Sequence, residues 1–299
     1  MLTSFWESVG EGLSQQWVER LFGPAFLFWA GGLVLWVGPA NLPAAWKRLS
    51  ALPVATQSAV LIGALLVLAG SSRLMEALRV PLLRLLEGYW PWPLSYLAVG
   101  VVAVRQKWVL RQRRRWSALM LKREEGALTW QERRELARLE AWRGSTPRDL
   151  EDLMPTRLGD ILRAAETRPR QRYGLDAVLL WPRLWLLLPD HAREDLAAAR
   201  AGLDRMVVAW GWGLLFAVWT LVWPWAWALA LAWMGVAYAL AVQAAQPFAD
   251  LLVATFDTHR WLLYEALRWP LPAQSGEPEI AAGEALTRYI QRGMLDEPR

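Results

Sequence analysis

An uncharged apolar run, MVVAWGWGLLFAVWTLVWPWAWALALAWMGVAYALAV at residues 206–242, defines the class of this protein. As one helix it would reach well over about 50 Å at roughly 1.5 Å per residue, whereas the hydrocarbon core of a bilayer is about 30 Å thick. Pro224 lies near its middle and removes a backbone donor that a continuous helix needs. The run therefore predicts two membrane-spanning helices, residues 206–222 and 225–242, joined by a hairpin with tryptophans at its tip.

Two more apolar runs, in the N-terminal part, are close to the minimum of about 17 residues that crosses a bilayer. Residues 21–38 carry no charge, and residues 54–70 have polar side chains only near their start. These runs bring the predicted spans to four. A fifth run, residues 89–104, opens with YWPWP and has only about eleven residues from Leu94 onward, too few for a full crossing. We predict a re-entrant or interfacial segment there; a fifth span is the alternative.

The composition supports a membrane location. Of the 299 residues, 55% are hydrophobic and 22 are tryptophan, a residue type that is enriched at membrane interfaces. The excess of arginine over lysine is typical of GC-rich bacterial genes. The chain has no cysteine, which excludes disulfides and thiolate ligands, and its two histidines offer little to a metal site. We expect a protein of the bacterial inner membrane without a metal or another cofactor.

The side of the membrane follows from the basic run RQKWVLRQRRR at residues 105–115. Under the positive-inside rule such a cluster stays in the cytoplasm. Residues 105–205 and the C-terminus are then cytoplasmic with either four or five spans. The sequence thus predicts an all-α polytopic membrane protein with a helical cytoplasmic domain. Its predicted segments are an N-terminal membrane region (1–104), a basic cytoplasmic domain (105–205), a transmembrane hairpin (206–246), and an amphipathic helix with a tail (247–299).

The basic segment has the pattern of a helical hairpin that turns at Gly126. Thr129 and Glu132 have the spacing of a capping box and predict the start of its second helix. Basic helices bind nucleic acid or anionic lipid, and a position beside the membrane favours lipid. We therefore expect the anionic headgroups of the bilayer as a partner and no nucleic acid. A homo-oligomer or a protein partner stays open.

A shorter apolar run lies in RYGLDAVLLWPRLWLLLPD, residues 172–190. It covers about twelve residues, 177–188, too few to span a bilayer. Pro182 predicts a break, so we expect a helix–break–helix seated at the cytoplasmic face of the membrane. Trp181 and Trp185 would lie at the interface, and Arg183 would pair with Asp176 or with lipid phosphate. The alternative is an ordinary buried helix of the cytoplasmic domain.

Three motifs in this part of the chain, PTRLGD (155–160), RYGLD (172–176) and WPRLW (181–185), carry a resemblance. Together they resemble a group of uncharacterised bacterial integral membrane proteins. The resemblance covers mainly residues 155–189, with LLEGYWP at 85–91 as a weaker match. It implies a multispanning membrane protein with no established activity, and it assigns no catalytic or binding residue.

A candidate functional site follows the last predicted span. The sequence has no phosphate-binding loop, dinucleotide fingerprint, HExxH motif or nucleophile elbow. Asp257, His259 and Arg260, however, bring a carboxylate, an imidazole and a guanidinium close to the bilayer, which suits a proton relay or a ligand site. The simpler interpretation is a helix that packs on the cytoplasmic domain. His191 and Asp195 lie one helical turn apart but give only two ligands, a weak metal site.

The predicted spans favour packing over chemistry. Their interiors carry no Asp, Glu, Lys, Arg or His, whereas ion-coupled transporters place such groups near the midplane. A stripe of small residues predicts close helix contact, formed by Ala228, Ala232, Gly235 and Ala239. We therefore expect a non-enzymatic scaffold or regulatory membrane subunit that couples a cytoplasmic partner to the membrane. The alternatives are a homo-oligomeric channel lined by Gln57, Thr220 or Tyr238, and then a membrane-embedded enzyme that uses Asp257 and His259.

Overall fold

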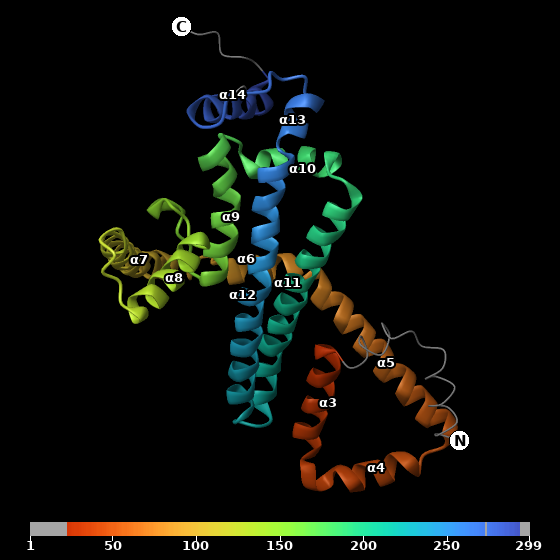
Figure 1. Ribbon diagram of the computed structural model, residues 1–299. Coiled ribbons are helices and arrows are strands. Elements are labelled where there is room, and N and C mark those ends of the chain that lie inside the picture. Colours follow the sequence, from red (N-terminus) through yellow and green to blue (C-terminus); the bar gives the residue numbers. More distant parts are fainter. Residues whose placement is uncertain (1–22, 273, 294–299) are drawn as a thin grey trace. The chain divides into compact units, whose positions relative to one another are not determined.

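The computed structural model describes residues 23–272 and 274–293, and every secondary-structure element in these ranges is a helix (Figure 1). The predicted all-α class is therefore confirmed. The α-helices are α3 (Pro24–Val37), α4 (Leu42–Ser50), α5 (Val54–Ala77), α6 (Arg79–Glu87), α7 (Ser95–Glu124), α8 (Trp130–Gly144), α9 (Arg157–Tyr173), α10 (Ala177–Leu187), α11 (Asp190–Phe216), α12 (Ala226–His259), α13 (Trp261–Ala266) and α14 (Glu277–Arg292). Short 3-10 helices are η1 (Pro39–Asn41), η2 (Leu150–Asp152) and η3 (Ala217–Leu221).

The chain divides into two compact units. The first unit comprises residues 1–82 and 205–240, and the second comprises residues 83–204 and 241–299. Helices α11 and α12 contribute to both units, because each continues past a division point. The segments predicted from the sequence end at residues 104, 205 and 246, whereas the units divide after residues 82, 204 and 240. Residues 83–104 thus group with the second unit.

Three helical segments in the described part of the chain are long and apolar enough to cross a membrane. They are α5, the run of α11 and η3 (Asp190–Leu221), and α12. Helices α3 and α4 meet the same criterion only together, as a pair bent by 104°. The first two residues of the predicted span 21–38 lie outside the described residues. Helix α7 is not among these candidates, because its apolar start leads directly into the basic run.

The two helices of the predicted hairpin extend far beyond the apolar run. Helix α11 begins at Asp190 instead of near residue 206, and α12 continues to His259 with Pro247 inside it. The sequence LDRMVV at 203–208 contains no residue that stops a helix, so helical hydrogen bonding continues through the expected boundary. The helix therefore does not end where its side chains change from polar to apolar.

The core of the first unit is rich in aromatic side chains. The ring centroid of Phe28 in α3 lies 5.2 Å from that of Trp212 and 5.8 Å from that of Trp219. Gly32 permits this approach, because a Cβ at that position would lie 2.0 Å from the Trp219 ring. These contacts hold α3 against α11 and η3.

The small-residue stripe of α12 that packs inward is not the predicted one. Ala232 and Gly235 are exposed, and a Cβ at Gly235 would meet nothing within 4 Å. The buried stripe consists of Ala226, Ala230, Ala237, Ala241 and Ala245. Both stripes recur at helical spacing and both are apolar, so the hydrophobic pattern did not determine how the helix is rotated about its axis.

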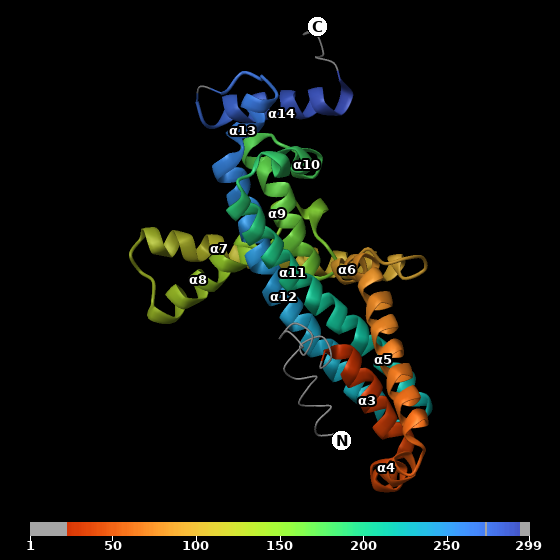
Figure 2. The ribbon, with the colours of Figure 1, turned by 90° about the vertical axis from the view of Figure 1, so that its right-hand side faces the viewer.

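In the second unit, α7 and α8 form an antiparallel hairpin, as Figure 2 shows. Its small core consists of Leu119, Leu136 and Leu139. The predicted capping box is present at the start of α8. The backbone N–H of Glu132 donates to Thr129 Oγ1 at 3.3 Å, and the backbone N–H of Thr129 donates to the Glu132 carboxylate at 3.1 Å. This element was predictable because both partners lie within one turn.

Helix α14 docks on α9 at two glycines where the backbones touch. Gly174 ends α9 with a left-handed φ of 70°, and a Cβ there would lie 2.1 Å from the carbonyl oxygen of Ile280. A Cβ at Gly283 would lie 1.9 Å from the carbonyl oxygen of Tyr173. The Thr287 hydroxyl adds a hydrogen bond to the Gly174 carbonyl at 3.1 Å. A side chain at either glycine would therefore push the two helices apart.

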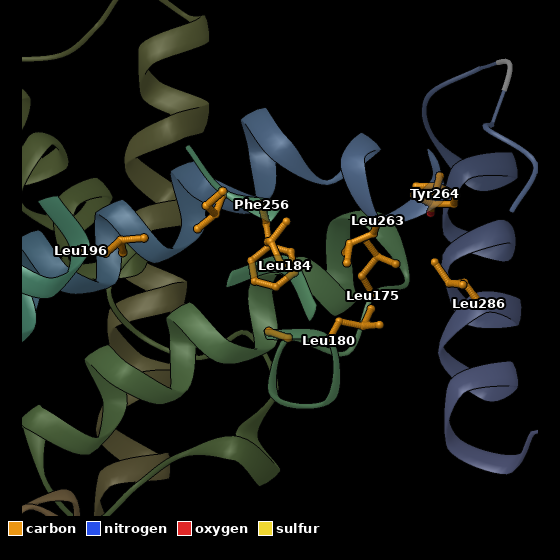
Figure 3. Packing of buried hydrophobic residues seen from close by; sticks show 10 residues of the cluster. Leu175, Leu180, Leu184, Leu196, Phe256, Leu263, Tyr264 and Leu286 are labelled. Atoms are coloured by element: carbon orange, nitrogen blue, oxygen red, sulfur yellow. The ribbon is translucent and has the colours of Figure 1, made fainter. Parts of the chain in front are cut away.

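The main hydrophobic core of the second unit surrounds α10 (Figure 3). Leu180 and Leu184 of α10 are completely buried, in a cluster that also contains Phe256, Leu263 and Leu286. These three residues belong to α12, α13 and α14 respectively. The core thus holds α10 against the end of α12 and the two helices that follow it.

Candidate functional site

The predicted polar group lies where three helices of the second unit end or begin. Helix α9 ends at Tyr173, because Gly174 adopts the left-handed conformation that terminates a helix. Helix α12 ends at His259, and Arg260 leads into α13. Helix α14 carries Glu279 in its first turn. Side chains from all three helices form the cluster described next.

Asp257 of α12 accepts hydrogen bonds from two residues at the end of α9. The Tyr173 hydroxyl donates to its carboxylate at 2.6 Å, and the Arg172 guanidinium donates to it at 3.0 Å. The pair with Arg172 is open to water and therefore weak, whereas the hydroxyl bond is short and charge-assisted. The pKa of Tyr173 is raised, first by burial and next by its hydrogen bond to Asp257. Tyr173 therefore keeps its proton and acts as a donor.

Arg260 packs against the ring of the same tyrosine. The carbon at the centre of its guanidinium lies 4.0 Å from the centroid of the Tyr173 ring, a cation–π contact. Its Nε donates to the Glu279 carboxylate at 2.7 Å, and its Nη1 donates to the backbone oxygen of Asp257. Glu279 is only 7% exposed. The ion pair is therefore largely shielded from water, and it links α14 to the end of α12.

His259 is not part of this cluster. Its Nδ1 lies 2.7 Å from Thr258 Oγ1, and within the described ranges it makes no hydrogen bond to Asp257. Residues two positions apart on a helix point to different sides, which explains this separation. The guanidinium of Arg260 forms its ion pair with Glu279 and not with the neighbouring Asp257 carboxylate.

Three members of the cluster were missed from the sequence: Arg172, Tyr173 and Glu279. Tyr173 and Asp257 are 84 residues apart in the chain, and no local spacing links them. The RYGLD motif was the only available signal, since it combines a basic residue, a tyrosine and a glycine at a predicted helix end.

The arrangement joins helices, and in the described residues each charged group of the cluster has a partner of opposite charge. No group of three or more His, Cys, Asp or Glu side chains in the described residues is placed to hold a metal ion. The buried Tyr264 hydroxyl of the same region has no hydrogen-bond partner among the residues that the structure describes. Burial, and then the charge of Glu279, raise the pKa of Tyr264 to about 12. This phenol therefore stays neutral.

Helix α10 is uninterrupted, which corrects the predicted helix–break–helix. Asp176 caps the helix by accepting a hydrogen bond from the Leu179 N–H at 3.0 Å. Arg183 donates to the Leu179 carbonyl at 3.0 Å, where we expected a pair with Asp176 or with lipid phosphate. Pro182 removes only the hydrogen bond to the carbonyl of Val178, an exposed residue in the first turns. The loss of one hydrogen bond does not end the helix, and α9 and α12 likewise continue through Pro169 and Pro247.

Trp181 and Trp185 lie along the side of α10. Their ring centroids are 5.8 Å apart, and Trp181 lies 6.1 Å from Phe256 of α12. Both tryptophans are partly buried against the main core. On the outer face, Val178 and Leu186 are 65% and 77% exposed. One face of α10 is thus buried, as the alternative interpretation expected, while an interfacial position of the outer face stays a prediction.

The PTRLGD motif forms a second polar group, which joins α9 to α6 and α7. Thr156 caps α9, and its hydroxyl donates to the Leu86 carbonyl at 2.6 Å. Asp160 is completely buried, accepts from the Met154 N–H at 3.0 Å and pairs with Arg105. Burial raises the pKa of Asp160, against the opposing effects of the Met154 N–H and Arg105. The motif therefore acts as a joint between helices.

In the described residues, these features define an all-helical protein with three helices long and apolar enough to cross a membrane, and with polar clusters whose charges neutralise one another. No family model, curated protein or solved structure matches this chain.

Proposed function

We propose that this chain is a multispanning protein of the bacterial inner membrane that serves as a non-enzymatic scaffold or regulatory subunit. It crosses the membrane four times, through α5, α11, α12 and the bent pair of α3 and α4. Residues 105–205 and the C-terminus face the cytoplasm, where they bind a protein partner and the anionic headgroups of the bilayer.

The observation that carries this proposal is the mutual pairing of charged groups in the second unit. The pairs are Arg172–Asp257, Arg260–Glu279 and Arg105–Asp160. Each pair joins two different elements of the unit. An active site leaves a charged or nucleophilic group open to its substrate, whereas these pairs fix helix positions. Such a unit is suited to presenting a defined surface to a partner.

A homo-oligomeric channel is the alternative, and two of the three side chains that would line it, Gln57 and Thr220, bond to nearby backbone carbonyls. Gln57 donates to the carbonyls of Ser50 and Leu52 at 3.1 and 2.9 Å, which closes the turn between α4 and α5. Thr220 donates to the carbonyl of Ala217 at 2.7 Å. Side chains bonded to their own backbone offer little to a passing ion, so we favour the scaffold.

Ion flux and crosslinking together test the proposal. We expect liposomes that contain the purified chain to pass ions no faster than empty liposomes. In cells, a photo-crosslinking residue at exposed Ala137 or Val178 of the second unit should give a discrete protein adduct. The same residue at Leu65 of α5 serves as the control, because it faces lipid in this proposal. Flux that Gln57→Leu reduces, without an adduct from the second unit, would replace the scaffold with the channel.

A further inference from the structure

We propose that α7 enters one leaflet of the bilayer with its first turns and binds acidic phospholipid headgroups through Lys107, Arg111 and Arg114. The inference rests on the membrane location proposed above. It adds the class of lipid and the residues that recognise it.

The first turns of α7 present an apolar surface that the second unit does not cover. Residues 95–104 carry no charge, and Tyr96, Val99 and Val104 are 72%, 70% and 69% exposed. Trp92, just before the helix, is 78% exposed. About ten residues rise roughly 15 Å, which is half of a hydrocarbon core of about 30 Å. This length fits one leaflet and does not reach across the bilayer.

The next two turns of the same helix present three cations without protein partners. Lys107, Arg111 and Arg114 are spaced i, i+4 and i+7, so they lie on one face of α7. All three are exposed. In the part of the chain that the structure describes, none of their side chains makes a hydrogen bond or an ion pair.

The other basic side chains of α7 have protein partners. The three unpaired cations are therefore not explained simply by the high arginine content of the helix. Arg115 and Lys122 pair with Glu135 and Glu132 of α8, both bonded at 2.7–2.8 Å. Arg113 donates to the carbonyl oxygens of residues 147 and 148. The unpaired positive charge of the helix is therefore concentrated on one face.

The apolar and basic parts form one continuous stripe. Tyr96, Gly100 and Ala103 precede Lys107 at the same helical spacing of three or four residues. Along this face the surface changes from apolar to basic, as the environment changes from acyl chains to headgroups. An acidic protein would satisfy the cations but would leave the apolar start of the stripe exposed. A bilayer with acidic lipids covers both parts.

The chemistry of the three side chains selects phosphate with net negative charge. Each guanidinium can donate two parallel hydrogen bonds to one phosphate, and the ammonium of Lys107 adds a point charge. Phosphatidylglycerol keeps the negative charge of its phosphate, whereas phosphatidylcholine neutralises it with choline. We therefore expect a preference for the acidic lipid.

The test uses the full chain in nanodiscs with and without phosphatidylglycerol. The variant Lys107→Gln/Arg111→Gln/Arg114→Gln is compared with Arg133→Gln/Arg134→Gln/Arg138→Gln, which removes the same charge from exposed positions of α8. The measurement is the retention of phosphatidylglycerol relative to phosphatidylcholine. Because the chain has no cysteine, Val104→Cys also gives a unique site for a spin label, whose accessibility to oxygen and to a water-soluble nickel complex reports its depth.

We expect the α7 variant to lose roughly tenfold or more of its lipid preference, since each basic residue near an acidic surface contributes about fivefold. The α8 variant should change it by less than about twofold, and the label at position 104 should be accessible to oxygen and protected from nickel. Equal losses in both variants, an unchanged preference in the α7 variant, or a nickel-accessible label would overturn the inference. A chain that leaves the membrane after alkaline washing would instead overturn the membrane location itself.

Discussion

Tyr173 contacts two charged residues of the candidate cluster, since its hydroxyl donates a hydrogen bond to Asp257 and its ring packs against Arg260. Tyr173→Phe removes the hydroxyl and keeps the ring. We expect it to lower the free energy of unfolding by about 1–2 kcal/mol, because Asp257 loses a charge-assisted hydrogen bond. Chemical denaturation in detergent measures this loss. His259→Ala is the control and should cost less than about 0.5 kcal/mol; equal losses would contradict the structural role of Tyr173.

Glu87, at the end of α6, makes the stability of the second unit depend on pH. Burial, and next the charge of Glu166, raise the pKa of Glu87 from 4.5 to about 7. The folded state therefore holds this proton more tightly than the unfolded state does. The group costs no stability below pH 4.5, its cost grows as the pH rises from 4.5 to about 7, and it stays constant above that.

Glu87→Gln should remove this cost. We expect the variant to be more stable than the parent by about 1 kcal/mol near pH 8, and equally stable near pH 4. Unfolding midpoints at the two pH values give the comparison. Glu125→Gln, at the exposed turn between α7 and α8, should change neither value. A gain of the same size at both pH values would mean that packing, and not charge, distinguishes the variant.

At the scale of elements, Gly159 sets the distance between α9 and the end of α6. A Cβ at Gly159 would lie 2.1 Å from the carbonyl oxygen of Glu87, a backbone atom that cannot rotate away. We expect Gly159→Ala to destabilise the protein by about 2 kcal/mol or more. Gly202 inside α11 is the matched control, because a Cβ there meets nothing within 4 Å. Gly202→Ala should stabilise by about 0.5–1 kcal/mol, so effects of the same sign would refute this explanation.

Helix starts that are marked by a nearby capping residue were predictable from the sequence. The contacts that these helices make with other helices were not. The start of α8 follows from Thr129 and Glu132, and Thr156 marks the start of α9, because a cap and its acceptor lie within one turn. The predicted break at Pro182 was wrong, since a proline removes one backbone hydrogen bond and the packing of the rest of the helix decides whether it continues, as it also does through Pro169 and Pro247. The bond from Tyr173 to Asp257 depends on how α9 packs against α12, which no spacing in the sequence records.

The membrane topology determines which surfaces of the protein can meet a cytoplasmic partner. Reporter fusions at Gly126 and at the C-terminus should both be active in the cytoplasm, because the basic run at 105–115 resists export. A single cysteine introduced by Ala51→Cys, in the turn after α4, should react with a membrane-impermeant thiol reagent in spheroplasts, since four spans place this turn outside. An external signal from either fusion would refute the cytoplasmic assignment. A protected cysteine at position 51 would refute the four-span arrangement.

The contact between α9 and α14 gives a rule for recognising distant relatives. Gly174 and Gly283 each face backbone atoms of the opposite helix. A smaller side chain at a neighbouring position would therefore not make room for a larger residue at either glycine. Selection on these two positions is therefore joint, although they lie far apart in the chain. We expect homologues to fall into two groups. One group keeps Gly174, Gly283 and helix α14, and the other group lacks the two glycines and the helix.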